Sequence, residues 1–162
     1  MTLIFSTSSG WISGLIRWFT KSRASHVMIG CEVMGVSMLM HCTEGGVQFT
    51  PRKKWFGDGN KLVAEYTFKP DVSEGVKHAT DLLGERYDYL SIIGFIWVIF
   101  WGWLKVKVKN PLASKGAMVC SEFILHVDHK DKIPEWNDLE YETTTPEDLL
   151  KACEKKISFD PT

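Results

Sequence analysis

The sequence predicts a single α+β domain in which an antiparallel β-sheet packs against helices. Its 162 residues are enough for one domain with its own core, and we expect that domain to cover residues 1–162. Up to residue 68, short segments rich in β-branched and apolar residues alternate with glycine-containing turns, as in an antiparallel sheet. Beyond residue 70, apolar residues recur at helical spacing beside capping signals.

The sheet is expected to contain at least three strands. Residues 26–33 and 36–49 form a predicted β-hairpin around Met34-Gly35, and the second strand is interrupted at Gly45-Gly46. A strand at 62–68 follows a polar loop at 57–60, and a short strand at 3–6 opens the chain.

Helices are predicted at residues 10–21, 72–83 and 119–127 and after Thr145. Asp71-x-x-Glu74 resembles a capping box, and Gly84 is expected to end the second helix. For the last helix, Thr145 is the expected N-cap and Pro146 the first helical residue.

Composition and the N-terminal residues argue against a nucleic-acid-binding protein and against a secreted, disulfide-bonded one. Nineteen basic and 20 acidic side chains give a net charge of -1, so we expect no nucleic-acid partner. The N-terminus lacks the pattern of a secretory signal, which favours a cytoplasmic protein. The four cysteines show no C-x-x-C pair and are expected to be reduced: Cys31, Cys42, Cys120 and Cys153.

Cys120 is the candidate nucleophile. It lies at or near the start of a predicted helix, where backbone N–H groups and the helix dipole stabilise a thiolate and an oxyanion. The alternative is a buried, inert cysteine.

His26 is the candidate base, and hairpin geometry selects its partner. In an antiparallel pair turning at Met34-Gly35, opposed residue numbers add up to 69, and pairs with an odd total share a face. His26 and His41 total 67, so they should be diagonal neighbours, whereas Glu44 should face away from His26. His41 is therefore predicted to orient the His26 ring, although either histidine alone could serve a structural role.

A zinc site is the rival use of these groups. Cys31 and Cys42 fall on the opposite face from the two histidines in this register, so we expect no metal and no cofactor. His78, His126 and His129 lie on predicted helices and are expected at the surface.

Four motifs together resemble the YiiX/YebB-like group of permuted papain-like enzymes, relatives of the NlpC cell-wall hydrolases and of lecithin:retinol acyltransferase. They span residues 25 to 149 in the order histidine strand, then cysteine helix: Ser25-His26-Val27-Met28-Ile29, Gly84-Glu85-Arg86-Tyr87-Asp88, Val119-Cys120-Ser121-Glu122-Phe123 and Thr145-Pro146-Glu147-Asp148-Leu149. The resemblance implies a permuted papain-like (NlpC-type) fold with the nucleophile at a helix N-terminus.

The same resemblance implies roles for individual residues. Cys120 would be the nucleophile, His26 the base and His41 the third polar residue, with Tyr87 and Ser121 near the substrate. The chain departs from the group in its short N-terminal portion and in the apolar segment after Tyr87, so the substrate is left open.

That apolar segment, 90–104, begins with Leu90, ends with Leu104 and contains no charge. As a helix it would be about 22 Å long, too short to cross about 30 Å of hydrocarbon. It is either a core helix or a contact with a membrane surface or acyl chain, the latter favoured by its tryptophans and the adjacent lysines.

The sequence thus predicts a thiol hydrolase, an amidase or peptidase, that acts on an amide or ester bond of a peptide or lipid acyl substrate through an acyl-enzyme. Two alternatives remain: a lipid acyltransferase or acyl hydrolase at a membrane surface, and a catalytically silent protein that binds membrane or a protein partner.

Overall fold

The computed structural model describes residues 1–8, 10, 13–14, 17–18, 21–43, 45–84, 86–87, 117–118, 120–127, 133–141, 143–155 and 157–162, with the backbone alone at 86–87 and 117–118. Of the helix predicted at 10–21, residues 13–14 and 17–18 are helical, residue 10 lies in a bend and residue 21 in a turn, and the others lie outside the described part. The apolar segment 90–104 also lies outside it.

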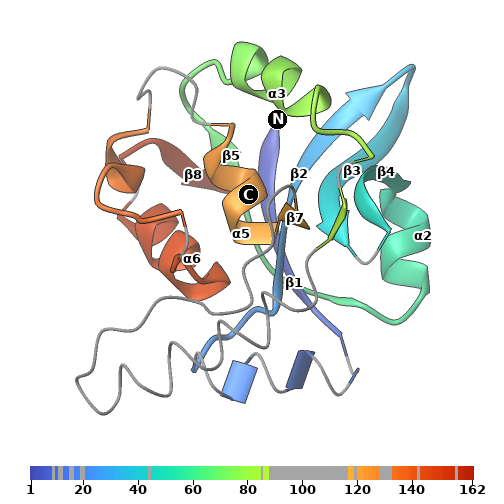
Figure 1. Cartoon of the computed structure of the whole chain (residues 1–162), viewed down its shortest axis with the longest axis horizontal. Helices are drawn as coiled ribbons and strands as arrows, with labels where there is room; N and C mark the ends of the chain where they lie inside the picture. The colour runs from blue at the N-terminus through green and yellow to red at the C-terminus, as the bar shows by residue number, and fades with distance from the viewer. Residues whose placement is uncertain are drawn as a thin grey trace.

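The described residues form a six-stranded, fully antiparallel sheet that confirms the predicted α+β class (Figure 1). The strand order is β4-β3-β2-β1-β5-β8. The bounds are β1 (Thr2–Thr7), β2 (His26–Val33), β3 (Val36–Thr43), β4 (Gly46–Pro51), β5 (Lys61–Phe68) and β8 (Phe159–Pro161).

The predicted strand 36–49 is in fact two strands. β3 and β4 pair from Thr43 with Gly46 onward, so the chain reverses within two residues instead of continuing past an interruption. Gly46 has φ 90, a conformation that strongly favours glycine, and this permits the second hairpin. The C-terminal strand β8, which has no alternating pattern, was not predicted.

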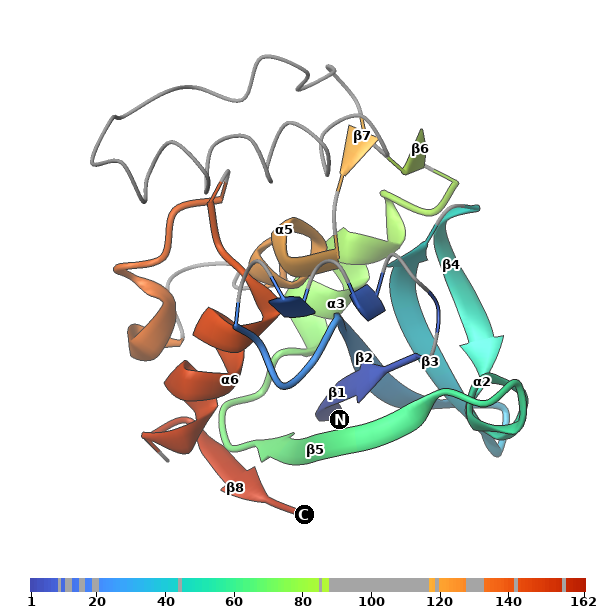
Figure 2. The same cartoon turned by 90° about the horizontal axis from the view of Figure 1, so that it is seen from below.

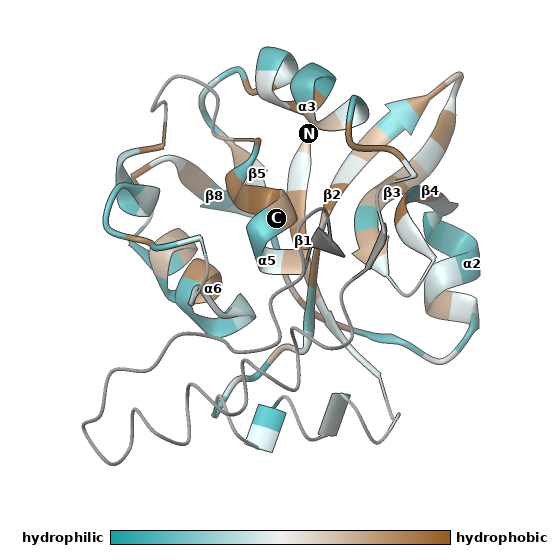
Figure 3. Ribbon diagram, viewed as in Figure 1, coloured by the Kyte–Doolittle hydropathy of each residue, from teal (hydrophilic) through white to brown (hydrophobic). Residues whose placement is uncertain are grey.

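Apolar side chains alternate between the two faces of the sheet and build two cores. Leu3, Phe5, Val27 and Ile29 pack with α3 (Ser73–Thr80), α5 (Cys120–Leu125) and α6 (Pro146–Glu154). On the opposite face, a smaller cluster of Ile4, Met28 and Leu39 packs against α2 (Arg52–Gly57). Figure 2 shows α3, α5 and α6 together on one side of the sheet and α2 beside its β4 end. In Figure 3, α5 is coloured mainly as hydrophobic, which fits its place in the larger core.

The helix ends match the predictions in part. In α6, Thr145 and Asp148 form a reciprocal capping box and Pro146 is the first residue, as predicted. In α3 the predicted capping box is absent: the N-cap is Val72, and the Asp71 carboxylate instead accepts the Ser73 N–H at 2.9 Å. The helix α3 ends at Thr80, and a turn follows it up to Gly84.

Two short elements complete the described fold. The 3₁₀ helix η1 (Pro134–Trp136) precedes α6, and strands β6 (Arg86–Tyr87) and β7 (Ala117–Met118) form a parallel pair. No helix in the described ranges is both long and apolar enough to cross a bilayer.

Candidate active site

The β2–β3 register is the one predicted. Ile29 pairs with Met40 and Val33 with Val36, so opposed numbers add up to 69. His26 and His41 therefore share a face, and their rings meet with His26 Nε2 3.0 Å from His41 Nδ1. The predicted contact between the two imidazoles is confirmed; we call these two rings the imidazole pair.

Thr50 extends the imidazole pair by one hydrogen bond. The second ring nitrogen of His41, Nε2, lies 2.9 Å from Thr50 Oγ1. Thr50 is opposite Leu39 in the β3–β4 register, which makes it a diagonal neighbour of His41 on the same face. Had the turn between β3 and β4 been recognised, strand alternation would have placed Thr50 on the same face as His41.

Trp55 of α2 packs against both imidazole rings. Its ring centroid lies 5.2 Å from that of His26 at an interplanar angle of 31°, and 4.7 Å from that of His41 at 85°. The indole Nε1 donates to Ser6 Oγ at 3.3 Å. Trp55 was missed because α2 has six residues, too few to show a helical period.

Burial keeps both imidazoles neutral at neutral pH. Burial, together with repulsion from a charge on His41, holds the pKa of His26 well below its usual value. Burial also lowers the pKa of His41 to about 4. Two neutral rings can share one proton across the contact between them, one ring donating and the other accepting.

Cys120 is the first residue of α5 and is buried. Burial raises the pKa of its thiol to about 11, although the backbone N–H groups of Val27, Ser121 and Cys120 itself act to lower it. The N–H groups expected at the helix start are therefore present, but they do not outweigh desolvation. Burial therefore favours a neutral thiol at rest.

The thiol approaches the sheet at the peptide that follows His26, from the face opposite the imidazole pair. The N–H it contacts belongs to Val27, the residue after His26. β2 pairs with β1 as far as His26 but with β3 only as far as Ile29, so Val27 lies beyond the end of the β2–β3 ladder. Within the described part no hydrogen bond joins Cys120 to His26, and His26 Nδ1 has no partner there.

The two predicted substrate contacts are placed differently. The Ser121 hydroxyl is buried and donates to the Thr144 carbonyl at 2.6 Å, which ties α5 to the segment before α6. The Tyr87 backbone pairs with Met118, two residues before Cys120, and the Tyr87 side chain lies outside the described part.

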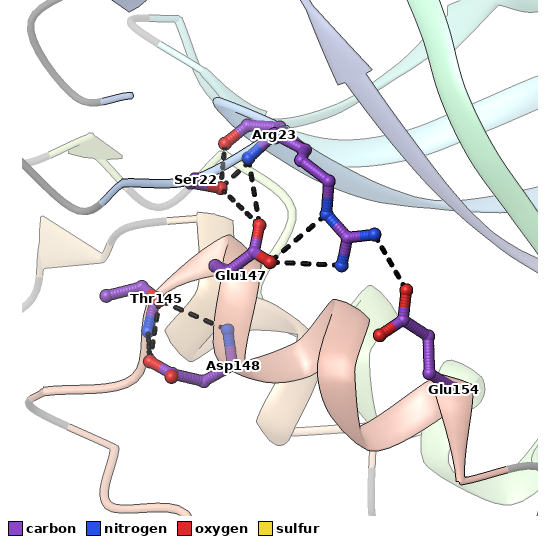
Figure 4. A network of polar contacts seen from close by, with 7 residues as sticks. Ser22, Arg23, Thr145, Glu147, Asp148 and Glu154 are labelled. Atoms are coloured by element: carbon purple, nitrogen blue, oxygen red, sulfur yellow. Dashed lines mark hydrogen bonds and ion pairs between the residues drawn. The ribbon is translucent and has the colours of Figure 1, made fainter. Parts of the chain in front are cut away.

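The Thr145-Pro146-Glu147-Asp148 motif anchors the segment that leads into β2 (Figure 4). Glu147 is buried, and its carboxylate accepts the backbone N–H of Arg23 at 2.8 Å and the guanidinium at 3.0 Å and 3.2 Å. Ser22 also donates to Glu147, at 3.3 Å, and the third guanidinium nitrogen, Nη1, donates to Glu154 at 2.7 Å. α6 thereby fixes the strand end that carries His26.

The remaining cysteines are free thiols, as is Cys120. Cys42 lies in the same core as Cys120, on the face opposite the imidazole pair, as the register predicts. In the described ranges no three His, Cys, Asp or Glu side chains converge as metal ligands.

The predicted surface histidines differ in burial. His78 is exposed on α3. His126 is half-buried and packs on Tyr141 with ring centroids 5.3 Å apart, so the expectation of a surface residue is only partly met there. His129 lies outside the described part.

No known protein family and no curated protein matches the sequence. Among solved structures, the metalloprotein YiiX from Escherichia coli O157:H7 is similar, with a TM-score of 0.57 and 17% identity over 99% of this chain and 94% of that one. At this identity the likeness concerns the fold alone. The chain has a YiiX-like α+β fold.

Proposed function

We propose that this chain is a thiol-dependent hydrolase of permuted papain-like type that cleaves an amide or ester bond, with Cys120 as nucleophile and His26 as base. One observation carries the proposal. His26 uses Nε2 to contact His41, which in turn contacts Thr50, so its Nδ1 remains for a proton while the Cys120 thiol lies against the neighbouring peptide.

The reaction begins from neutral groups. His26 Nδ1 removes the thiol proton as Cys120 Sγ attacks the substrate carbonyl, and a tetrahedral oxyanion forms. The oxyanion collapses, the amine or alcohol leaves with the proton from His26, and a thioester remains on Cys120. Water then attacks the thioester and gives a proton to His26 Nδ1. As the second tetrahedral oxyanion collapses, His26 returns that proton to the departing Sγ, which releases the acid and restores the neutral thiol.

General-base catalysis is favoured over a preformed ion pair by the shifted pKa values. The pKa of the Cys120 thiol is raised to about 11, and the pKa of His26 is lowered. Both groups are therefore neutral at pH 7. The proton moves only when substrate brings the two groups into hydrogen-bond reach, because such contacts are often long before substrate binds.

The similar YiiX structure is described as that of a metalloprotein. In this chain the facing nitrogens of the imidazole pair contact each other, and no third ligand converges with them among the described residues. The imidazole pair and the other described residues therefore offer no set of metal ligands, and each proposed step is written with protein groups and water.

The test is acylation by an activated ester, followed by intact mass and peptide mapping. The wild type should carry one acyl group, on Cys120, and Cys120→Ala should carry none. His26→Gln keeps a side-chain N–H near His41 but removes the base, so it should slow acylation about a hundredfold. The matched control His78→Gln changes an exposed histidine and should acylate as the wild type does.

Equal acylation of several cysteines, or undiminished acylation of His26→Gln, would refute the catalytic proposal and favour a silent binding protein. If Cys120 alone is acylated, incubation with peptide and lipid extracts, followed by a search for adducts on that residue, identifies the acyl donor.

A further inference from the structure

We propose that Thr50 is a positioning residue: its hydroxyl oxygen fixes the tautomer of His41 and, through His41, the tautomer of His26. This inference rests on the proposed function, in which His26 Nδ1 must be unprotonated before the thiol attacks.

His41 has two ring nitrogens and two contacts. It is fully buried on β3, with Nδ1 at 3.0 Å from His26 and Nε2 at 2.9 Å from Thr50 Oγ1. A neutral imidazole carries one N–H and one lone pair, so the direction of one hydrogen bond fixes the direction of the other.

Two arrangements satisfy these contacts, and one of them gives a base. If Thr50 accepts the Nε2–H of His41, then His41 Nδ1 accepts the Nε2–H of His26, and His26 Nδ1 carries a lone pair. If Thr50 donates to His41 instead, every bond reverses and His26 Nδ1 carries the proton. The second arrangement cannot accept the thiol proton.

The placement of Thr50 suits an acceptor. The residue is only half-buried, so its own O–H can donate to water while Oγ1 accepts from the buried ring. Trp55 covers the imidazole pair on the α2 side, which favours a tautomer set by protein groups over one set by solvent.

The test variant is Thr50→Val, which keeps the side-chain shape and removes the acceptor. A buried N–H without an acceptor is strongly disfavoured, so His41 should move its proton to Nδ1 and donate to His26. His26 then holds its proton on Nδ1. Acylation of Cys120 should fall about a hundredfold, as expected when a positioned base is lost.

Nitrogen-15 NMR of the imidazoles gives a readout that a merely structural role would not change. The wild type should show His41 protonated at Nε2 and His26 at Nε2, and Thr50→Val should show both protonated at Nδ1. Thr50→Ser keeps a hydroxyl at this position and should therefore keep the wild-type tautomers and the wild-type acylation rate. Thr67→Val, at an exposed threonine that contacts Thr162, is the matched control and should change neither.

The outcomes separate this proposal from the hydrolase itself. Wild-type histidines protonated at Nδ1, or tautomers that do not change in Thr50→Val, overturn the role of Thr50 even if Cys120 is acylated. In another outcome, the wild type shows both histidines protonated at Nε2, and Thr50→Val both at Nδ1, while Cys120 is never acylated. That result supports the role of Thr50 in setting the tautomers and refutes the proposed hydrolase activity.

Discussion

Gly75 in α3 provides a direct test of how the helices pack over the sheet. A Cβ added at Gly75 would lie 1.8 Å from the carbonyl oxygen of Val127, whereas Cβ contacts below 3.0 Å essentially do not occur. The carbonyl belongs to the turn after α5, so no side-chain rotation can relieve the clash. Gly75→Ala must therefore separate α3 from this turn by about 1.2 Å.

The sign of the effect distinguishes packing from helix propensity. Alanine in place of glycine inside a helix gains up to about 1 kcal/mol. Overpacking costs about 1–3 kcal/mol, and a rigid backbone partner places this site at the upper end. Gly75→Ala should therefore lower the free energy of unfolding by about 2 kcal/mol.

Urea denaturation measures this free energy, and a thermal scan should show a fall in Tm of roughly 4–8 °C. Gly57→Ala, in α2, is the matched control, because a Cβ there meets nothing within 4 Å. It should be neutral or slightly stabilising. A Gly75→Ala protein as stable as the wild type, or a Gly57→Ala protein equally destabilised, would refute the close approach of α3 to α5.

Three further predictions concern the site and its anchor. Burial alone would raise the pKa of Glu147, but the hydrogen bonds from Arg23 outweigh burial and hold the pKa below 4.5. The ionised Glu147 carboxylate therefore stabilises the fold above pH 4.5. This stabilisation is lost as the pH falls through the lowered pKa. Glu147→Gln should cost about 1–2 kcal/mol at pH 7 in urea titrations and should flatten the loss of stability in acid; an unchanged acid profile would contradict this. In a pH–rate profile of Cys120 acylation by the activated ester, the acid limb should lie below pH 6.5, because a base with a lowered pKa stays neutral to lower pH. An acid limb at or above pH 6.5 would be inconsistent with the burial of His26. Trp55→Ala should expose the imidazole pair and raise both histidine pKa values in an NMR titration, whereas Phe56→Ala on the same helix should not; equal effects would show that Trp55 does not shield the rings.

Register in the first hairpin could be predicted from local features. A two-residue turn at Met34-Gly35 and the alternation of a strand determine which residues share a face, and they placed His41 beside His26 before any tertiary contact was considered. The capping box of α6 is equally local, because Thr145 and Asp148 are three residues apart.

Contacts between distant segments could not be predicted in this way. Trp55 reaches the imidazole pair from a six-residue helix with no readable period, and Glu147 contacts Arg23 across more than a hundred residues of chain. The raised pKa of the Cys120 thiol has a related cause. The helix start is a local feature, whereas the burial that raises the pKa of the thiol depends on the sheet beneath it.

The sequence by itself determined the α+β class, the first hairpin and the pairing of the two histidines, because strand alternation and turn geometry act over a few residues. Tertiary structure alone decided the neutral state of the thiol, the cover that Trp55 places over the rings, and the contact of Cys120 with the peptide next to His26. Desolvation and packing depend on which segments meet in space, and that is set by the whole chain.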